Sequence, residues 1–347
     1  MTRNDLYKLL IRCKRPHEFF GAVADEDALK KLYFSFAKLL HPDTASSDEK
    51  YISEEAIKRL NELYDMGRKE LLDGIYSVSS VTARYSSMSP LFSLNIRSKE
   101  YHFYEYIFDG EVADVYRGVC NGQVVCLKHA KLSEDDALLE AEYDTLMQIA
   151  HVLLPVMREK LTINGTTALI MDEVEGVMLT EIIEQYPSGI PVEHIPWILE
   201  RLFSVVGYLH FNKIVHGNLT SENVMLNKAN HKVSTVGFSF HIPNADSPDS
   251  RYKTRNPRYC APEISKIARV TPAADIYSIG RIAIELLGGD LDTNTLPSSI
   301  DPRLRLFIGK LTEPNVSKRP YDAWRLWDEL IALRQQVFGP KRFIPLI

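Results

Sequence analysis

The stretch VHGNLTSENVML, residues 215–226, places two asparagines in a polar loop that follows an apolar segment. In a loop that transfers phosphoryl groups, a carboxylate takes the proton of the attacking hydroxyl, and a second side chain further along holds magnesium. Asn218 stands at the position of that carboxylate. An amide can accept a hydrogen bond from a hydroxyl but cannot take its proton. The stretch therefore leaves three interpretations open: a working active site, a repurposed site, or a scaffold that keeps the fold but not the phosphoryl-transfer chemistry.

The N-terminal segment carries two amphipathic patterns joined by a short polar loop. Apolar side chains recur at i, i+3, i+4 and i+7 along residues 29–40, and a second set recurs along residues 57–71. The first pattern stops at His41, because the ring of Pro42 excludes the helical conformation from the residue before it. Two helices with so short a connection should pack antiparallel, as a hairpin with this loop at its tip.

Residues from about 5 to 73 resemble a J domain, the module with which co-chaperones stimulate ATP hydrolysis in DnaK-type chaperones. LKKLYFSFAKLLHPD matches the second helix and loop of that family, and LNELYDMGRKELL matches its third helix. The resemblance implies contact with the chaperone through His41, Pro42, Asp43, Lys30 and Lys31. Phe34 and Ser35 replace a basic pair that the family often carries, so we expect weaker electrostatic docking. The alternative is that the tripeptide only caps and closes a turn.

After this hairpin the pattern changes from helices to strands. Residues 74–94 are rich in serine and lack helical periodicity, which indicates a linker. YEYIFDGEVADVYRGV and QVVCLKHAKL predict a hairpin joined by Asn-Gly. SEDDALLEAEYDTLMQI predicts a helix with Ser133 and Asp136 at capping-box spacing, and ALIMDEVEG predicts a buried strand. A further amphipathic helix over residues 198–209 leads into the loop that contains Asn218.

Over roughly residues 95 to 335 this order resembles the bilobal protein-kinase fold, in which a small β-rich lobe precedes a larger helical lobe. The motifs VCLK, HGNLTSEN, APE, DIYSIG and KRP occur in the order of that family. The resemblance places Lys128 at the phosphate-pairing lysine, Glu142 at its helix partner and Asp172 in the hinge. It implies an architectural role for Glu263, Asp275 and Arg319, with the arginine of KRP paired to the glutamate of APE.

The positions that this fold uses for chemistry carry unsuitable residue types. Thr235 replaces the carboxylate of the DFG motif, which leaves Asn223 as a vestigial metal ligand. Magnesium prefers anionic oxygen, so we expect no metal site. The phosphate loop FDGEVADVY keeps Gly110 alone of three glycines and surrounds it with acidic residues, which disfavours a nucleotide. With Asn218 and Thr235 degenerate, the sequence predicts a pseudokinase rather than an enzyme.

Lys128 and Glu142 allow two interpretations. Together with Asp172 they could support weak ATP binding without a metal, or they could form an ion pair that ties a helix to the sheet. Gly217 replaces the arginine that usually receives an activation-loop phosphate, so we expect no phosphorylation switch at that contact. The loop SRYKTRNPRY holds four basic residues that either face solvent or dock an acidic or phosphorylated partner.

Composition narrows the class of protein. The 347 residues carry a net charge of -5 and a pI near 6.1, which disfavours nucleic acid as the main partner. No run of eighteen apolar residues and no secretion signal is visible, so we expect a cytoplasmic protein without a membrane partner. The four cysteines show no CxxC spacing, so neither a disulfide nor a zinc framework is expected.

The predicted fold class is α+β, with an all-α J-domain hairpin at 1–73, a linker at 74–94 and a bilobal kinase-like domain at 95–340. The first functional hypothesis is a co-chaperone that stimulates a DnaK-type chaperone and binds a client or partner through its pseudokinase domain, with no required cofactor. The second is a divergent active kinase or another nucleotide-dependent transferase, since one fold hosts many chemistries. The third is a regulatory scaffold that engages no chaperone. The intact His-Pro-Asp and the degenerate metal site favour the first; the client, the chaperone and the oligomeric state stay open.

Overall fold

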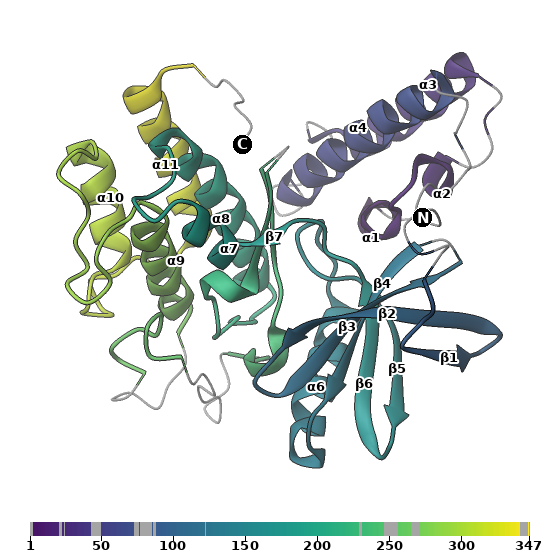
Figure 1. Ribbon diagram of the computed structural model, residues 1–347. Helices are drawn as coiled ribbons and strands as arrows, with labels where there is room; N and C mark the ends of the chain where they lie inside the picture. Colours follow the sequence, from purple (N-terminus) through teal and green to yellow (C-terminus); the bar gives the residue numbers. More distant parts are fainter. Residues whose placement is uncertain are drawn as a thin grey trace. The chain divides into compact units, whose positions relative to one another are not determined.

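The computed structural model describes residues 3–20, 23, 25–42, 50–72, 76, 85, 88–121, 123–228, 231–245, 256–264, 271–340 and 346. The chain has an α+β fold with a β-sheet lobe and a helical lobe, preceded by N-terminal helices (Figure 1). It divides into two compact units. The first comprises Met1–His129, Ala150–Val152 and Ile170–Asp172, and the second comprises Ala130–Ile149, Leu153–Leu169 and Glu173–Ile347.

The described N-terminal residues form four helices, namely α1 (Arg3–Arg12), α2 (Pro16–Phe20), α3 (Glu26–Leu40) and α4 (Lys50–Leu72). α3 is capped at its start by Asp25, whose carboxylate accepts a hydrogen bond from Ala28 N at 2.8 Å. It ends at His41, which has an extended conformation as expected before a proline.

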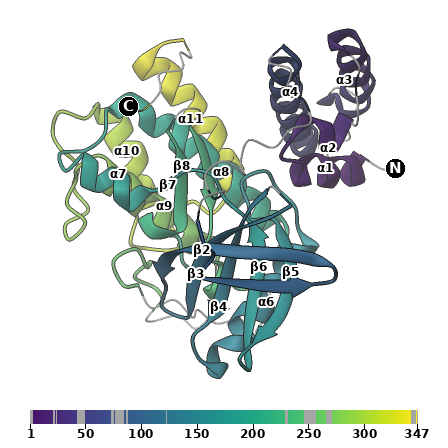
Figure 2. The same ribbon diagram turned by 45° about the vertical axis from the view of Figure 1, so that its right-hand side comes forward.

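α3 and α4 form the antiparallel hairpin that the sequence periodicity predicts, and they lie side by side in Figure 2. Tyr33 stacks on Tyr64 with ring centroids 4.3 Å apart, and its hydroxyl donates to Asn61 Oδ1 at 2.8 Å. Glu26, at the start of α3, pairs with Arg68, near the end of α4. The residues fully buried between the helices of this region include Leu10, Leu29, Leu40, Leu60 and Leu63.

Two short segments, 150–152 and 170–172, belong to the same unit as these helices. Ala150 and Val152 pack against the apolar core of the helices. Tyr51 of α4 lies nearly parallel to the buried ring of His151, with its hydroxyl 3.1 Å from His151 Nε2. Because these residues are 100 positions apart in the chain, helical periodicity could not predict the contact.

A sheet of six strands, in the order β1-β2-β3-β4-β6-β5, forms the β lobe. The strands are β1 (Phe92–Ile96), β2 (Lys99–Asp109), β3 (Ala113–Cys120), β4 (Gln123–Ala130), β5 (Met157–Ile163) and β6 (Thr166–Asp172). β3 and β4 are neighbours on either side of Asn-Gly, as predicted. The domain boundary expected at residue 95 falls inside β1, whose Phe92 stacks on Phe103 of β2.

The helix predicted over SEDDALLEAEYDTLMQI begins differently from the expectation. Ser133–Asp135 form a short 3-10 turn, and α6 (Asp136–Gln148) follows without a side-chain cap. The carboxylate of Asp136 instead accepts a hydrogen bond from the backbone N of Thr167, at 2.6 Å. The predicted capping box was wrong, because a strand competes for the carboxylate that would have completed it.

The second unit is built mainly of helices. They are α7 (Leu179–Gln185), α8 (Ile195–Phe211), α9 (Ala273–Leu286), α10 (Pro302–Leu311) and α11 (Ala323–Phe338), with a small sheet of β7 (Val177–Met178), β8 (Val224–Asn227) and β9 (Lys232–Thr235). The predicted helix over 198–209 is α8, which is buried along most of its length. Gly207 of α8 lets the ring of Trp324 approach closely, since a Cβ there would lie 2.3 Å from Trp324 Nε1. Among the described helices, none is both long and apolar enough to cross a membrane.

Candidate functional site

The loop after α8 is held by a buried carboxylate from α9. Asp275 Oδ2 accepts hydrogen bonds from His216 N and from His210 Nε2, both at 2.9 Å, and Oδ1 accepts one from Gly217 N at 3.0 Å. Burial raises the pKa of Asp275, but the hydrogen bonds from His210 and Gly217 outweigh it and bring the pKa below its ordinary value. Asp275 therefore serves as an ionised acceptor that fixes the shape of the loop.

Asn218 and Asn223 are brought together at the end of this loop. Asn223 Nδ2 donates to the carbonyl of Asn218 at 2.9 Å. Gly237, with φ of +74°, lies directly against the same amide, because a Cβ at Gly237 would be 2.1 Å from Asn223 Oδ1. Both polar ends of the Asn223 side chain are thus packed against protein backbone, and the loop needs a glycine at position 237.

Thr235 is next to Asn223 in the fold, because Val224 and Thr235 face each other in the antiparallel pair β8–β9. The side chain of Thr235 is fully buried. Within the described part of the chain, its hydroxyl has no hydrogen-bond partner. The residue that the sequence resemblance placed at the metal-binding carboxylate of DFG thus offers an uncharged, solvent-excluded hydroxyl.

Glu142 lies on α6 and is 2% exposed. Its Oε2 accepts a hydrogen bond from Ser239 Oγ at 2.9 Å. One turn further along α6, Thr145 Oγ1 lies 2.7 Å from Nε2 of His241, whose Nδ1 donates to Phe238 O. The segment after Gly237 is therefore fixed on α6 by two polar contacts. The two interpretations of Glu142 from the sequence, nucleotide binding with Lys128 or an ion pair with it, did not include this contact with Ser239.

The first unit carries the phosphate-loop positions and Lys128. The turn between β2 and β3 is tight: Gly110 N donates to Ala113 O at 3.1 Å, and a Cβ at Gly110 would lie 2.6 Å from that oxygen. Asp114 Oδ1 accepts a hydrogen bond from the hydroxyl of Tyr106 at 3.0 Å. Burial and this hydrogen bond raise the pKa of Tyr106 to about 12. Lys128 is half-buried on β4.

Asp172, at the end of β6, is 5% exposed. Its Oδ2 lies 4.0 Å from the ammonium of Lys14, which follows α1. The N-terminal helices therefore reach the carboxylate that the sequence placed in the hinge. The sequence did not identify Lys14 as a partner of Asp172, because a single lysine between two helices is not part of a recognisable motif.

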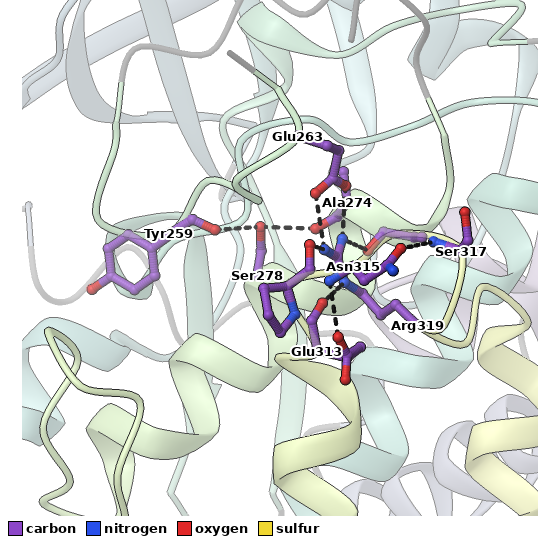
Figure 3. Close-up of polar contacts among 10 residues, drawn as sticks. Tyr259, Glu263, Ala274, Ser278, Glu313, Asn315, Ser317 and Arg319 are labelled. Atoms are coloured by element: carbon purple, nitrogen blue, oxygen red, sulfur yellow. Dashed lines mark hydrogen bonds and ion pairs between the residues drawn. The ribbon is translucent and has the colours of Figure 1, made fainter. Parts of the chain in front are cut away.

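Glu263 and Arg319 form a buried bidentate pair (Figure 3). Arg319 Nη1 donates to Glu263 Oε1 at 2.7 Å, and Nη2 donates to Oε2 at 2.8 Å. Two further guanidinium contacts reach the backbone oxygens of Ala273, at 3.0 Å, and of Glu313, at 2.7 Å. The guanidinium also lies over the ring of Tyr277 at 4.7 Å. Arg319 thus joins the APE segment, the start of α9 and the loop after α10.

The positions expected to contact a chaperone lie at both ends of α3, with His41 and Pro42 after its last residue and Lys30 and Lys31 near its start. His41 caps α3 and is exposed, Pro42 follows it, and Lys30 and Lys31 are exposed on α3. Asp43 lies outside the described residues. So do three basic residues of the expected docking loop, Arg251, Lys253 and Arg255. The fourth, Arg258, pairs with Glu285 of α9 at 3.2 Å.

Buried histidines are a feature that the sequence did not reveal. His216 donates from Nε2 to Val236 O at 3.0 Å, and burial lowers its pKa to about 4. His194 Nδ1 and His231 Nε2 lie 3.0 Å apart, and burial and the neighbouring His194 lower the pKa of His231 to about 4. Single histidines on apolar elements give no sequence signal that separates a buried from an exposed ring.

These histidines predict a loss of stability in mild acid. A neutral buried histidine must gain a proton on unfolding at any pH below its ordinary pKa of about 6.5, so its contribution is complete above that pH and lost as the pH falls toward 4. For His216 the loss is about 2 kcal/mol at pH 5. We expect the melting temperature to fall between pH 7 and pH 5 in differential scanning calorimetry. A constant melting temperature over this range would contradict the burial of these rings.

The residues present do not fit a bound magnesium ion. Asn223 and Thr235 offer one amide and one alcohol, whereas magnesium requires near-octahedral oxygen ligands and favours carboxylates. In the described ranges, no three or more histidine, cysteine, aspartate or glutamate side chains are grouped to hold a metal. The four cysteines are free thiols.

The β-sheet lobe and the helical lobe together define a protein-kinase-like domain. The protein kinase domain family matches residues 101–296, more than half of the chain, so the chain belongs to that family. The N-terminal helices precede the matched region.

The chain is similar to parts of several larger proteins. Cell division control protein 7 of Schizosaccharomyces pombe is 26% identical over 220 residues, which is 61% of this chain and 20% of that protein. L-type lectin-domain containing receptor kinase VIII.1 of Arabidopsis thaliana is 24% identical over 260 residues, 69% of this chain and 36% of that protein. Serine/threonine-protein kinase TIO of the same plant is 27% identical over 198 residues, which is 55% of this chain and 15% of that protein. The match thus spans between 15% and 36% of the length of these relatives.

Proposed function

We propose that this chain is a pseudokinase, a kinase-fold module that binds a protein client or partner and has lost magnesium-dependent phosphoryl transfer. The observation that supports this most directly is Thr235, an uncharged and fully buried side chain at the metal-binding position. Asn218 adds to it, because an amide cannot act as a general base. The retained Asp275 and the Glu263–Arg319 pair maintain the shape of the helical lobe, which is what a binding surface requires.

The N-terminal hairpin is the second part of the proposal. We infer that it acts as a J domain that stimulates a DnaK-type chaperone, to which the kinase-like domain delivers its client. Support comes from the antiparallel packing of α3 and α4 and from His41 exposed at the tip. Lys30 and Lys31 add positive charge on the same helix, suited to an acidic surface on the chaperone.

The test of this part is chaperone stimulation by the full chain. We expect the wild-type protein to raise the steady-state ATPase rate of a DnaK-type chaperone from the same organism, and His41→Gln to abolish the increase. The exposed position of His41 means that the helices should stay folded, which circular dichroism checks. His102→Gln, on β2, is the matched control and should stimulate normally. Equal stimulation by His41→Gln and wild type would contradict the co-chaperone role.

A divergent active kinase, or another nucleotide-dependent transferase, is the second candidate. It is favoured by membership of the protein kinase family, by relatives named as kinases, and by the retained Lys128, Glu142 and Asn223. Two ATP samples, one labelled in the γ-phosphate and one in the α-phosphate, separate the candidates. Label transferred to the chain or to casein, and lost in Lys128→Met but not in Lys99→Met, would establish the second candidate. We expect no transfer of either label.

A further inference from the structure

An open groove lies on the second unit along α10 and the loop that follows it. Its volume is about 660 Å³, and its lining includes Pro302, Arg305, Leu306, Lys310, Glu313 and Lys318. Leu306 is 76% exposed, and Gly309 leaves the surface open, since a Cβ there would meet nothing within 4 Å. The groove lies beyond residue 296, where the match to the kinase family ends.

The lining of this groove is basic although the chain as a whole carries a net charge of -5. The lining has three cations, Arg305, Lys310 and Lys318, and one carboxylate, Glu313. Lys310 pairs with Glu329 of α11 at 2.5 Å, which leaves Arg305 and Lys318 as the cations of the groove. Glu313 is turned into its own loop, where Oε1 accepts a hydrogen bond from Asn315 N at 2.9 Å. For Arg305, no hydrogen-bond partner of the buried Nε exists in the portion of the chain that is described. Arg305 and Lys318 together outweigh the single carboxylate of Glu313, so the groove keeps an excess of positive charge.

The loop that forms one wall of the groove is rigid. Arg319 Nε donates to Glu313 O at 2.7 Å, and the backbone N of Lys318 donates to Asn315 O at 2.9 Å (Figure 3 shows the side chains around Arg319). The opposite face of α10 is anchored by Phe307 and Ile308, which are buried. A wall that is already ordered loses little conformational entropy when a ligand binds.

We propose that this groove docks a short acidic segment of a partner protein. One aliphatic side chain of that segment covers Leu306, and its carboxylates face Arg305 and Lys318. An exposed leucine in a concave surface with a charged rim is the arrangement of a protein interaction site, and the excess positive charge of Arg305 and Lys318 favours acidic partners. The proposal requires neither chaperone stimulation nor loss of catalysis.

The test uses the full chain and a fluorescein-labelled peptide, EEDLEE, followed by fluorescence anisotropy. We expect saturable binding that weakens about tenfold in Lys318→Glu and in Leu306→Asp. Both residues are exposed, so the variants should melt at the wild-type temperature, which thermal denaturation checks. Lys99→Glu is the matched control, because Lys99 is exposed on β2 and does not line the groove. It should bind as wild type does.

Three results would overturn the proposal. The first is no binding of EEDLEE, or binding that Lys318→Glu and Leu306→Asp leave unchanged. The second is equal binding of EEDGEE, which would show that charge alone is recognised and that Leu306 has no part. The third is a concentration-dependent dimer in analytical ultracentrifugation that Leu306→Asp dissociates, which would assign the groove to a second copy of the chain.

Discussion

Arg319→Ala is expected to lower the free energy of unfolding by about 3 to 5 kcal/mol, the usual cost of removing one partner of a buried ion pair. The change leaves the carboxylate of Glu263 buried without its bidentate partner. It also removes the donors to the backbone of Ala273 and Glu313. Three segments that are distant in sequence lose a common contact, so the effect should be at the upper end of this range.

Urea denaturation followed by tryptophan fluorescence measures the effect. Arg303→Ala is the matched control, because that arginine pairs with Asp301 at the surface and its loss should cost less than about 1 kcal/mol. Arg319→Lys should be intermediate, since lysine keeps the charge but cannot form the planar bidentate pair. A midpoint for Arg319→Ala equal to that of the wild type would show that the pair does not hold these segments together.

Millimolar magnesium-ATP is expected to leave the melting temperature nearly unchanged. A ligand that binds only the folded protein adds about 2.7 kcal/mol at a hundredfold excess over Kd, which is several degrees for a domain of this size. That stabilisation requires a site for the metal and for the phosphates. Thr235 brings no charge to the metal, and Asn223 is packed against Asn218 and Gly237. Asp109 and Glu111 are exposed at the β2–β3 turn, and their negative charges repel phosphate groups that approach this turn.

The sequence was most informative where a repeating pattern matched a whole element. The apolar periodicity of residues 29–40 and 57–71 predicted α3 and α4, and that of residues 198–209 predicted α8, because burial of one face requires that spacing. The ordered kinase motifs predicted the bilobal fold, since each motif marks a fixed point along it. Glu263 and Arg319 could be named together for the same reason.

Contacts that depend on one distant partner could not be predicted. β1 was missed although FSLNI alternates apolar and polar residues, the pattern of a half-buried strand, because the predicted linker was extended through residue 94. The capping box failed because the backbone of Thr167 takes the carboxylate of Asp136. Lys14 meets Asp172, and Ser239 meets Glu142, only once the chain is folded. The spacing of these residues in the sequence does not predict such pairs.

Thermal denaturation of the full chain with ATP, with and without magnesium, tests the loss of phosphoryl-transfer chemistry most directly. Four samples suffice: protein alone, with magnesium, with ATP and EDTA, and with both ligands at millimolar concentration. We predict that magnesium-ATP shifts the melting temperature by less than about one degree, and that ATP with EDTA produces at most a modest shift through Lys128. A shift of several degrees that requires magnesium and disappears in Lys128→Met would contradict the proposed pseudokinase and would favour a divergent active kinase.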